Sequence, residues 1–338
     1  MNVVLRHLKN VVLSGFARAG IARLGVSLHA RDALVLAYHG ILREAKGEPF
    51  GYHHTAAEFE SHLDWLGVHC QPVGLTDFAR WKRGEWQPAK PPVLITFDDG
   101  YRNNATVAAP LLRRKGFPAL FFINSGYVEA GRVLWPEEVF IRILAWTGPS
   151  LVDPNGAEHA VPQARDARER LGFAMVEVCK NCSDDRRREF MAYLARETPH
   201  CDPMLDREVQ EILSWNEVCA LANDGFDLGS HTVSHPILSQ LSPEALTVEL
   251  RESRTALEER TGRPCVSLAY PVGRLHDVTE AVLSATAGAG YEYAFIVSDR
   301  WCERGTDPLR IDRISTPGHS NHATFALHVS GSRRWFPR

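Results

Sequence analysis

The chain has 338 residues, of which 44% are hydrophobic and 23% are charged. This composition is typical of a globular protein with a large core, and it excludes a disordered or fibrous chain. The formal net charge of -3, without a long block of like charge, gives no reason to expect nucleic acid as a partner.

Residues 1–30 contain no acidic residue and four basic ones: Arg6, Lys9, Arg18 and Arg23. Apolar residues recur between them at helical spacing: Leu5, Leu8, Val12 and Phe16. The uncharged run 10–17 is too short to span a bilayer and is short for a signal-peptide core. We predict a basic amphipathic helix and a cytoplasmic protein. The helix either makes peripheral contact with an anionic membrane surface or packs on the domain with its charges in water.

Six short apolar segments, each bounded by turn residues, predict buried strands. In chain order they are residues 33–40, 93–97, 119–124, 226–230, 266–270 and 293–297. Several end in polar side chains followed by glycine. The most marked case is residues 93–100, where an apolar run leads directly into Asp98 and Asp99.

Helices are predicted between these strands, over residues 55–69, 105–115, 214–225, 242–259 and 279–287. Capping boxes mark two of their starts, at Thr55 with Glu58 and at Ser214 with Glu217. Pro243 is well placed in the first turn of another. Alternating strands and helices imply a parallel sheet with right-handed crossovers.

Residues 129–212 differ from this pattern because they are rich in charge, show helical periodicity and lack a convincing buried strand. We interpret them as a mainly helical insertion near the active-site mouth, within one domain that spans residues 31–338. Functional residues at the carboxyl ends of half a dozen strands favour a closed or nearly closed β/α barrel. A doubly wound open sheet is the alternative.

Seven cysteines are scattered along the chain, which does not suggest a disulfide framework and favours a reducing compartment. Cys179 and Cys182 form a single C-x-x-C in a polar, helical stretch. Structural zinc requires further ligands, so we expect chance spacing on a helix rather than a zinc site.

The adjacent carboxylates Asp98 and Asp99 are the first candidate site. They repel each other and are costly to desolvate, so they need a cation, a donor network or solvent. Asp-Gly is also a common turn signal, and a solvated turn is the plain alternative.

His231 and His235 follow the 226–230 strand and face the same way if the turn between them is helical. With Asp99 they form a set of two histidines and one carboxylate, which suits one divalent transition metal with open positions. Zinc is the expected ion, and cobalt and nickel are alternatives. Such an ion lowers the pKa of bound water and polarises a carbonyl, and Asp98 beside it could then act as general base.

Three motifs resemble those of the polysaccharide deacetylases, the NodB-homology enzymes of carbohydrate esterase family 4. They are TFDDG at 96–100, HTVSH at 231–235 and AYPV at 269–272. The resemblance covers roughly residues 33–125 and 214–320. It implies a distorted (β/α) barrel of NodB type and metal-dependent hydrolysis of an N-acetyl or O-acetyl group on a sugar.

The resemblance also implies roles for individual residues. Asp98 would be the base, and the oxyanion would be held by the metal and a backbone N–H near Tyr101. The metal ligands would be Asp99, His231 and His235. We expect Tyr270 and Pro271 to shape the substrate groove.

Two departures from the family pattern concern the base and the acid. The third motif usually starts with an arginine that orients the base, but Ala269 occupies that position, so Arg313 or Arg274 is the candidate replacement. The late Leu-x-His motif, which supplies the general acid, is not evident. Tyr38-His39 is similar to an early Tyr-His in some biofilm-polysaccharide deacetylases. We therefore assign His39 as general acid, with a hydrogen-bonded structural histidine as the alternative.

We expect a metal-dependent hydrolase that removes an acetyl group from an N-acetylated sugar in a polysaccharide, oligosaccharide or glycolipid precursor. Its partner would be a glycan or a lipid-linked sugar. Two alternatives stay open. The same site could hydrolyse another amide, such as a formamido sugar, or the chain could be a non-catalytic glycan-binding protein that kept the fold.

Overall fold

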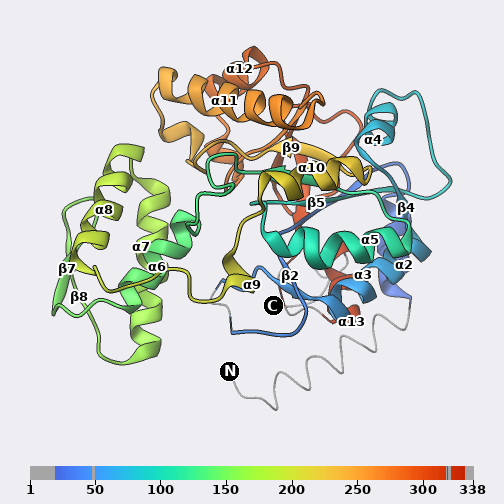
Figure 1. Cartoon of the computed structure of the whole chain (residues 1–338). Helices are drawn as coiled ribbons and strands as arrows, with labels where there is room; N and C mark the ends of the chain where they lie inside the picture. Colours follow the sequence, from blue (N-terminus) through green and yellow to red (C-terminus); the bar gives the residue numbers. More distant parts are fainter. Residues whose placement is uncertain (1–19, 48–49, 317, 319–320, 332–338) are drawn as a thin grey trace.

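The computed structural model describes residues 20–47, 50–316, 318 and 321–331. At its centre a closed barrel of seven parallel strands is surrounded by helices (Figure 1). The strand order is β1-β12-β11-β10-β9-β6-β5, and β5 pairs back onto β1. The prediction of a β/α barrel is confirmed, and this closure excludes the open doubly wound sheet.

The barrel strands are short and largely buried. Their bounds are Leu34–Tyr38 (β1), Pro92–Phe97 (β5), Leu120–Ile123 (β6), Asp227–Ser230 (β9), Ser267–Ala269 (β10), Tyr293–Val297 (β11) and Ile311–Ser315 (β12). All six predicted strands are present. The seventh, β12, was not predicted because Asp312 and Arg313 interrupt its apolar pattern, although both side chains are buried.

Three short strands before α5 lie outside the closed ring. Gln71–Pro72 (β4) pairs with β5 on its outer side. Ile41–Leu42 (β2) and His54–Thr55 (β3) form a separate parallel pair close to the end of β1.

Helices cover the outside of the barrel. Their bounds are Ile21–Leu28 (α2), Ala56–His69 (α3), Leu75–Lys82 (α4), Ala109–Lys115 (α5), Trp215–Asn223 (α10), Pro243–Thr261 (α11), Glu280–Gly288 (α12) and His322–Val329 (α13). Both predicted capping boxes form. The helix predicted over 105–115 is divided, because Asn104–Ala108 is a π-helical turn that precedes α5. Helices α4 and α13 were not predicted, and short 3₁₀ turns occur at Leu238–Gln240 and Leu275–Asp277.

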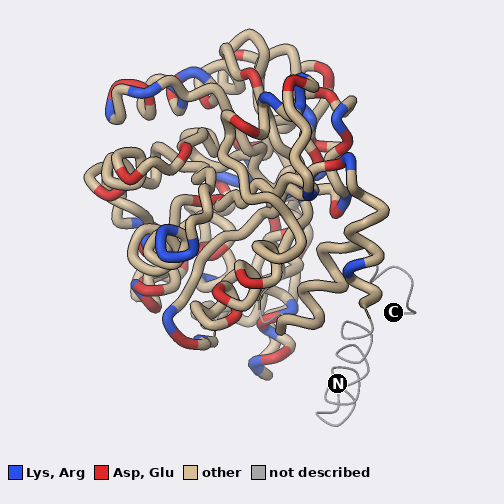
Figure 2. The backbone as a smooth tube through the Cα atoms, turned by 90° about the vertical axis from the view of Figure 1, so that its right-hand side faces the viewer, with Lys and Arg blue, Asp and Glu red and all other residues tan. Residues whose placement is uncertain are grey.

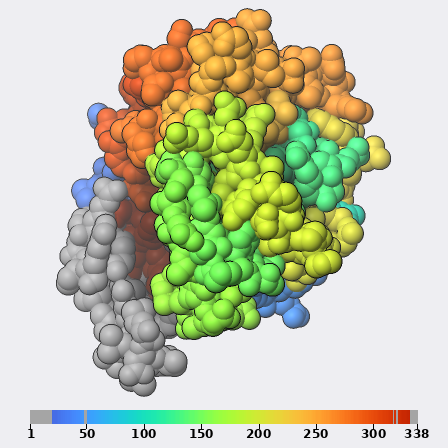
Figure 3. Space-filling model, turned by 90° about the vertical axis from the view of Figure 1, so that its left-hand side faces the viewer, coloured from blue at the N-terminus to red at the C-terminus, as the bar shows by residue number. Residues whose placement is uncertain are grey.

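Between β6 and α10 the chain builds a layer of helices on one side of the barrel (Figure 1). The layer contains Trp135–Leu144 (α6), Arg165–Asn181 (α7), Asp184–Glu197 (α8) and the short Arg207–Gln210 (α9). It also contains an antiparallel hairpin, Ser150–Val152 (β7) with Glu158–Ala160 (β8), which was not expected. A core of its own joins α6, α7 and α8. In Figure 3 this green layer occupies the face of the molecule below the orange region, which contains α11 and α12.

Residues 1–19, which contain most of the predicted N-terminal helix, lie outside the described part of the chain. The described helix α2 packs against α13. No helix in the described ranges is both long and apolar enough to cross a bilayer. Basic and acidic residues are interspersed over the face shown in Figure 2. Peripheral membrane contact through residues 1–30 stays a prediction.

Alternation along the strands divides the barrel residues between two environments. Leu94 of β5 belongs to the inner core with Phe122 and Phe295, while its neighbours Val93 and Ile95 pack outward beneath the helices. Because the side-chain period of a strand is two, the series that starts at residue 94 continues through 96 to 98. The strand pattern therefore directs Asp98 into the mouth of the barrel.

Candidate metal centre and active site

The chain turns sharply after β5, where Asp99 and Gly100 have φ values of 73° and 75°. Left-handed backbone is easy for glycine but unfavourable for aspartate. This turn lets Asp99 as well as Asp98 project into the mouth, although neighbours on a regular strand would point to opposite faces. Asn124 supports the turn, because its Nδ2 lies 3.3 Å from the backbone oxygen of Asp99.

Asp99, His231 and His235 form a buried cluster in which the candidate ligand atoms lie within 4.8 Å of one another. The Nε2 atoms of His231 and His235 are 3.5 Å and 3.4 Å from Asp99 Oδ1. In the described part of the chain no other group of His, Cys, Asp and Glu side chains has this geometry. The structure therefore brings together the three residues expected to bind the metal.

The chemistry of the cluster suits a divalent cation. Asp99 Oδ1 is buried and has no hydrogen-bond partner, which is costly unless a cation faces it. His231 Nδ1 is 2.7 Å from the carbonyl oxygen of Ala269, so it donates its hydrogen there and leaves the Nε2 lone pair directed toward Asp99. Burial lowers the pKa of His235 to about 3, which keeps this imidazole neutral, as a metal ligand must be.

The loop that carries the two histidines is not the helical turn considered from the sequence. Thr232 and His235 have φ values of 69° and 56°. The carboxylate of Glu249 on α11 anchors the loop: Oε2 accepts the backbone N–H groups of Val233 (2.8 Å) and Ser234 (3.0 Å). Its Oε1 accepts the Ser234 hydroxyl at 2.6 Å. The buried carboxylate of Glu249 thus binds the backbone N–H groups that a helical turn would have satisfied locally.

The helical layer supports His235 from the other side. Trp135, the first residue of α6, is fully buried and donates its Nε1–H to the carbonyl oxygen of His235 at 2.8 Å. The Arg187 guanidinium of α8 lies 4.9 Å from the centre of the Trp135 ring. The position of His235 therefore depends on both the barrel and the helical layer.

Asp98 is held by a bidentate ion pair with Arg313 of β12. The Nη1–Oδ1 and Nη2–Oδ2 distances are 2.7 Å and 2.8 Å, and Nη1 also donates to Thr96 Oγ1 at 3.0 Å. Burial alone would raise the pKa of Asp98. The charge and hydrogen bonds of Arg313, together with the nearby His231 and His39, outweigh burial, so the pKa lies below its ordinary value. Arg274, the other candidate, pairs with Asp277 at 2.7 Å. Arg313 therefore provides the guanidinium that the family's third motif usually supplies at position 269.

His39, directly after β1, lies across the mouth from the two histidines of the cluster. Its Nε2 is 4.0 Å from Asp99 Oδ2, and its ring stacks on Tyr52 with centroids 4.9 Å apart. His39 Nδ1 is buried without a hydrogen-bond partner, so this ring nitrogen is not fixed as in a hydrogen-bonded structural histidine. Burial also lowers the pKa of His39.

The remaining predicted site residues differ in where their side chains point. Tyr101 lines the site, and its hydroxyl donates to Glu137 Oε1 at 3.1 Å. Tyr270 points into the core, where its hydroxyl donates to the carbonyl oxygen of Leu309 at 3.0 Å. In the loop after β10, Val272 lines the cavity, while Pro271 is buried beside it.

A cavity of about 170 Å³ opens beside the cluster. Its wall includes side chains that the sequence did not single out: Phe50, Tyr52, Leu134, Glu137 and Lys180. Glu137 belongs to the helical layer and lies far in sequence from the three motifs. No motif marks it or Glu249. Both residues reach the site only because their helices pack on the barrel.

Comparisons with known proteins concern the family and the fold. The family model described as Polysaccharide deacetylase matches residues 86–175 and 180–294. YxkH of Bacillus subtilis is 20% identical over 278 residues, which cover 82% of this chain and 70% of YxkH. The structure is similar to the Streptococcus pyogenes deacetylase PplD in complex with acetate, with 16% identity, a TM-score of 0.59 and coverage of 88% and 98% of the two chains. It is similar to IcaB from Ammonifex degensii, with 18% identity, a TM-score of 0.56 and coverage of 88% and 97%. At these identities the structural likeness shows the fold alone.

Replacing Arg313 by leucine should lower the free energy of unfolding by about 3–5 kcal/mol, because Asp98 would be left buried without its counter-charge. Urea denaturation at neutral pH measures the loss. As a matched control, Arg80 of α4 is 46% exposed and pairs with Asp77, which is 50% exposed. The Arg80→Leu variant should lose less than about 1 kcal/mol, because both partners of this pair are in contact with water. Equal small losses in both variants would contradict the importance of the buried pair.

Replacing Glu249 by alanine should weaken metal binding about 10–100-fold, because the histidine loop loses the group that fixes its shape. Competition with a chromophoric zinc chelator measures the affinity. Glu252→Ala, at an exposed position of the same helix, should leave the affinity unchanged. Wild-type affinity in the Glu249→Ala variant would show that the loop keeps its conformation without this anchor.

Proposed function

The chain belongs to the polysaccharide deacetylase family, and we propose that it is a metal-dependent hydrolase of N-acetylated sugars. The substrate would be an acetylated sugar in a polysaccharide, oligosaccharide or glycolipid precursor. One observation carries the proposal: Asp98, paired with a buried arginine, lies beside a buried Asp-His-His cluster whose carboxylate oxygen lacks a partner. The structure of PplD, which has a similar fold, is a complex with acetate, the product that this reaction would release.

In the proposed reaction Asp98 accepts the proton of the water that attacks the acetyl carbonyl. The Arg313 pair orients the carboxylate and keeps it ionised at neutral pH, so that it is ready to accept that proton. A divalent ion held by Asp99, His231 and His235 would lower the pKa of a water molecule and polarise the carbonyl. The backbone N–H of Tyr101 would donate to the developing oxyanion.

His39 would donate a proton to the leaving nitrogen, so that acetate and a free amine are released. Its side chain lines the site cavity and lies close to Asp99. A lowered pKa makes the protonated imidazole a stronger acid, although a smaller fraction is protonated at neutral pH. This position in the cavity wall supports the assignment of His39 to the second half of the reaction, in which the carbon–nitrogen bond breaks.

The geometry of the site bears differently on the two alternative hypotheses, the glycan-binding protein and the hydrolase of another amide. The non-catalytic glycan-binding protein was suggested by the missing motif arginine and late histidine. Arg313 and His39 provide a guanidinium and an imidazole at the site, which removes much of the reason for that reading. Hydrolysis of another amide, such as a formamido sugar, would use the same residues. Only the acyl group of the substrate distinguishes that reaction from deacetylation.

Replacing Asp98 by asparagine should abolish acetate release while most of the metal stays bound, because an amide cannot accept the proton of the attacking water. We would measure acetate from N-acetylated and N-formylated oligosaccharides with added zinc, cobalt or nickel, and metal content by mass spectrometry. Asp77→Asn, at a position 50% exposed on α4, is the matched control and should keep full activity.

Wild-type acetate release by the Asp98→Asn variant would overturn the assignment of the base. A wild-type protein that releases no acid from any substrate, yet still binds the oligosaccharides, would favour the glycan-binding reading. Formate release without acetate release would identify the alternative amide substrate.

Replacing His39 by glutamine should lower kcat on an N-acetyl sugar about 10²–10⁴-fold, because the amine leaving group needs a proton. An aryl acetate should be affected much less, since a phenolate leaves without one. Steady-state kinetics on both substrates test the assignment, with His200→Gln at an exposed position as control. Equal losses on both substrates would show that His39 supports the structure of the site instead.

A further inference from the structure

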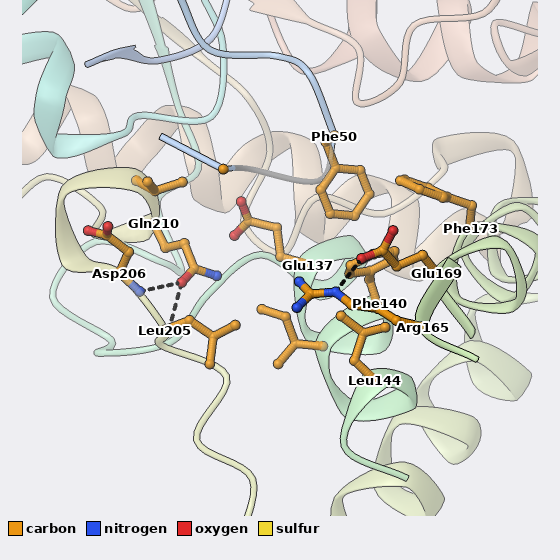
Figure 4. Close-up of a pocket in the computed structure, with 13 residues that line it drawn as sticks. Phe50, Glu137, Phe140, Leu144, Arg165, Glu169, Phe173, Leu205, Asp206 and Gln210 are labelled. Carbon is orange, nitrogen blue, oxygen red and sulfur yellow. Dashed lines mark hydrogen bonds and ion pairs between the residues drawn. The ribbon is translucent and has the colours of Figure 1, made fainter. Parts of the chain in front are cut away.

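A second cavity, of about 420 Å³, shares part of its wall with the site cavity. Figure 4 shows the side chains that line this second cavity. It lies between the segment around Phe50, helices α6 and α7, and the stretch 205–210. Most of its wall is apolar, with Phe50, Phe140, Ile141, Leu144, Phe173 and Leu205. Phe50 and Glu137 line this cavity and the site cavity alike. A single molecule could therefore occupy both.

Aromatic rings form one side of this second cavity. The Phe50 ring packs edge-on against Phe140 and Phe173, with centroids 5.3 Å and 5.5 Å apart. Phe173 is nevertheless 39% exposed, and Leu205 across the cavity is 68% exposed. Large apolar side chains left open around a concave surface are typical of a binding site.

Several polar side chains at the rim already have hydrogen-bond partners within the protein. Arg165 Nε lies 2.9 Å from Glu169 Oε1. Gln210 Oε1 accepts the backbone N–H groups of Leu205 and Asp206, at 2.8 Å and 3.1 Å (Figure 4). A further sugar ring could stack its apolar face on a phenyl ring, but the hydroxyls around its edge would lose hydration and would need polar partners at the rim that are not already engaged. An aliphatic chain has no such cost and gains from leaving water.

We propose that this second cavity binds an aliphatic chain attached to the substrate sugar, as in a glycolipid. The proposal rests on the proposed function, since it assumes that the acetylated ring occupies the site cavity. Glu137 lies at the junction, where its Oε1 accepts the Tyr101 hydroxyl at 3.1 Å. The polar junction would face the sugar, and the phenylalanine-lined cavity would take the chain.

The test compares the octyl and methyl glycosides of N-acetylglucosamine as substrates. The wild-type protein should show a kcat/KM about tenfold or more higher for the octyl glycoside, mainly through a lower KM. Leu144→Trp, which places an indole in the cavity, should bring the ratio of the two values close to one. Val68→Trp, at a position 64% exposed on α3, should keep the wild-type ratio.

Two further measurements separate a local effect from misfolding and from failure of the catalytic proposal. Phe173→Ser removes part of the apolar wall at a half-exposed position without adding bulk, and it should also lower the ratio. Octyl glucoside, which has no acetamide and is used below its micellar concentration, should raise the Tm of the wild-type protein but not that of Leu144→Trp.

The outcomes distinguish the two proposals. Acetate release from both glycosides at equal kcat/KM would overturn the chain-binding cavity and leave the proposed function intact. Binding of octyl glucoside without acetate release from any substrate would support the cavity and overturn the function. A kcat/KM for N-acetylated chitotetraose far above that for the octyl glycoside would assign the cavity to further sugar rings and overturn the proposal.

Discussion

The buried ion pair between Arg313 and Asp98 connects the architecture of the barrel to its site. Two charges in a dry interior are costly unless each is fully matched, and the bidentate geometry supplies that match. Arg313 is on β12 and Asp98 follows β5, with β1 paired between these strands. The guanidinium can reach the carboxylate only because the ring of strands is closed. The position and charge state of the proposed base, Asp98, therefore depend on closure of the barrel.

Backbone strain is concentrated beside this pair. In the part of the chain that the structure describes, six non-glycine residues have positive φ, and four of them lie in loops at the mouth: Asp99, Thr232, His235 and Val272. Each such conformation costs of order 1–3 kcal/mol and persists only where the surroundings impose it. Here Glu249 holds the histidine loop from α11, and Trp135 holds the carbonyl of His235 from α6. Packing energy from the surrounding helices thus offsets the strain that points three ligands at one place.

The helical layer between β6 and α10 does more than cover the barrel, because it contributes residues to the site. It provides Trp135 behind His235, Glu137 in the wall of the site cavity, and most of the wall of the neighbouring apolar cavity. The end of α7 also approaches the barrel loops, since Arg274 Nη2 lies 3.3 Å from the carbonyl oxygen of Lys180. Sequence differences in this layer would therefore alter what can lie next to the acetylated sugar while the cluster itself stays the same.

The sequence by itself determined the features that depend on near neighbours. Short apolar runs bounded by turn residues located six strands, and capping boxes located two helix starts. The motifs singled out Asp98, Asp99, His231 and His235. It could not choose between Arg313 and Arg274, because the partner of Arg313 is 215 positions away and is brought close only by closure of the barrel. It also missed β12, whose charged residues are buried, and the carboxylates Glu137 and Glu249. Only the tertiary structure decided these, because burial and pairing of a charge depend on distant segments that pack around it.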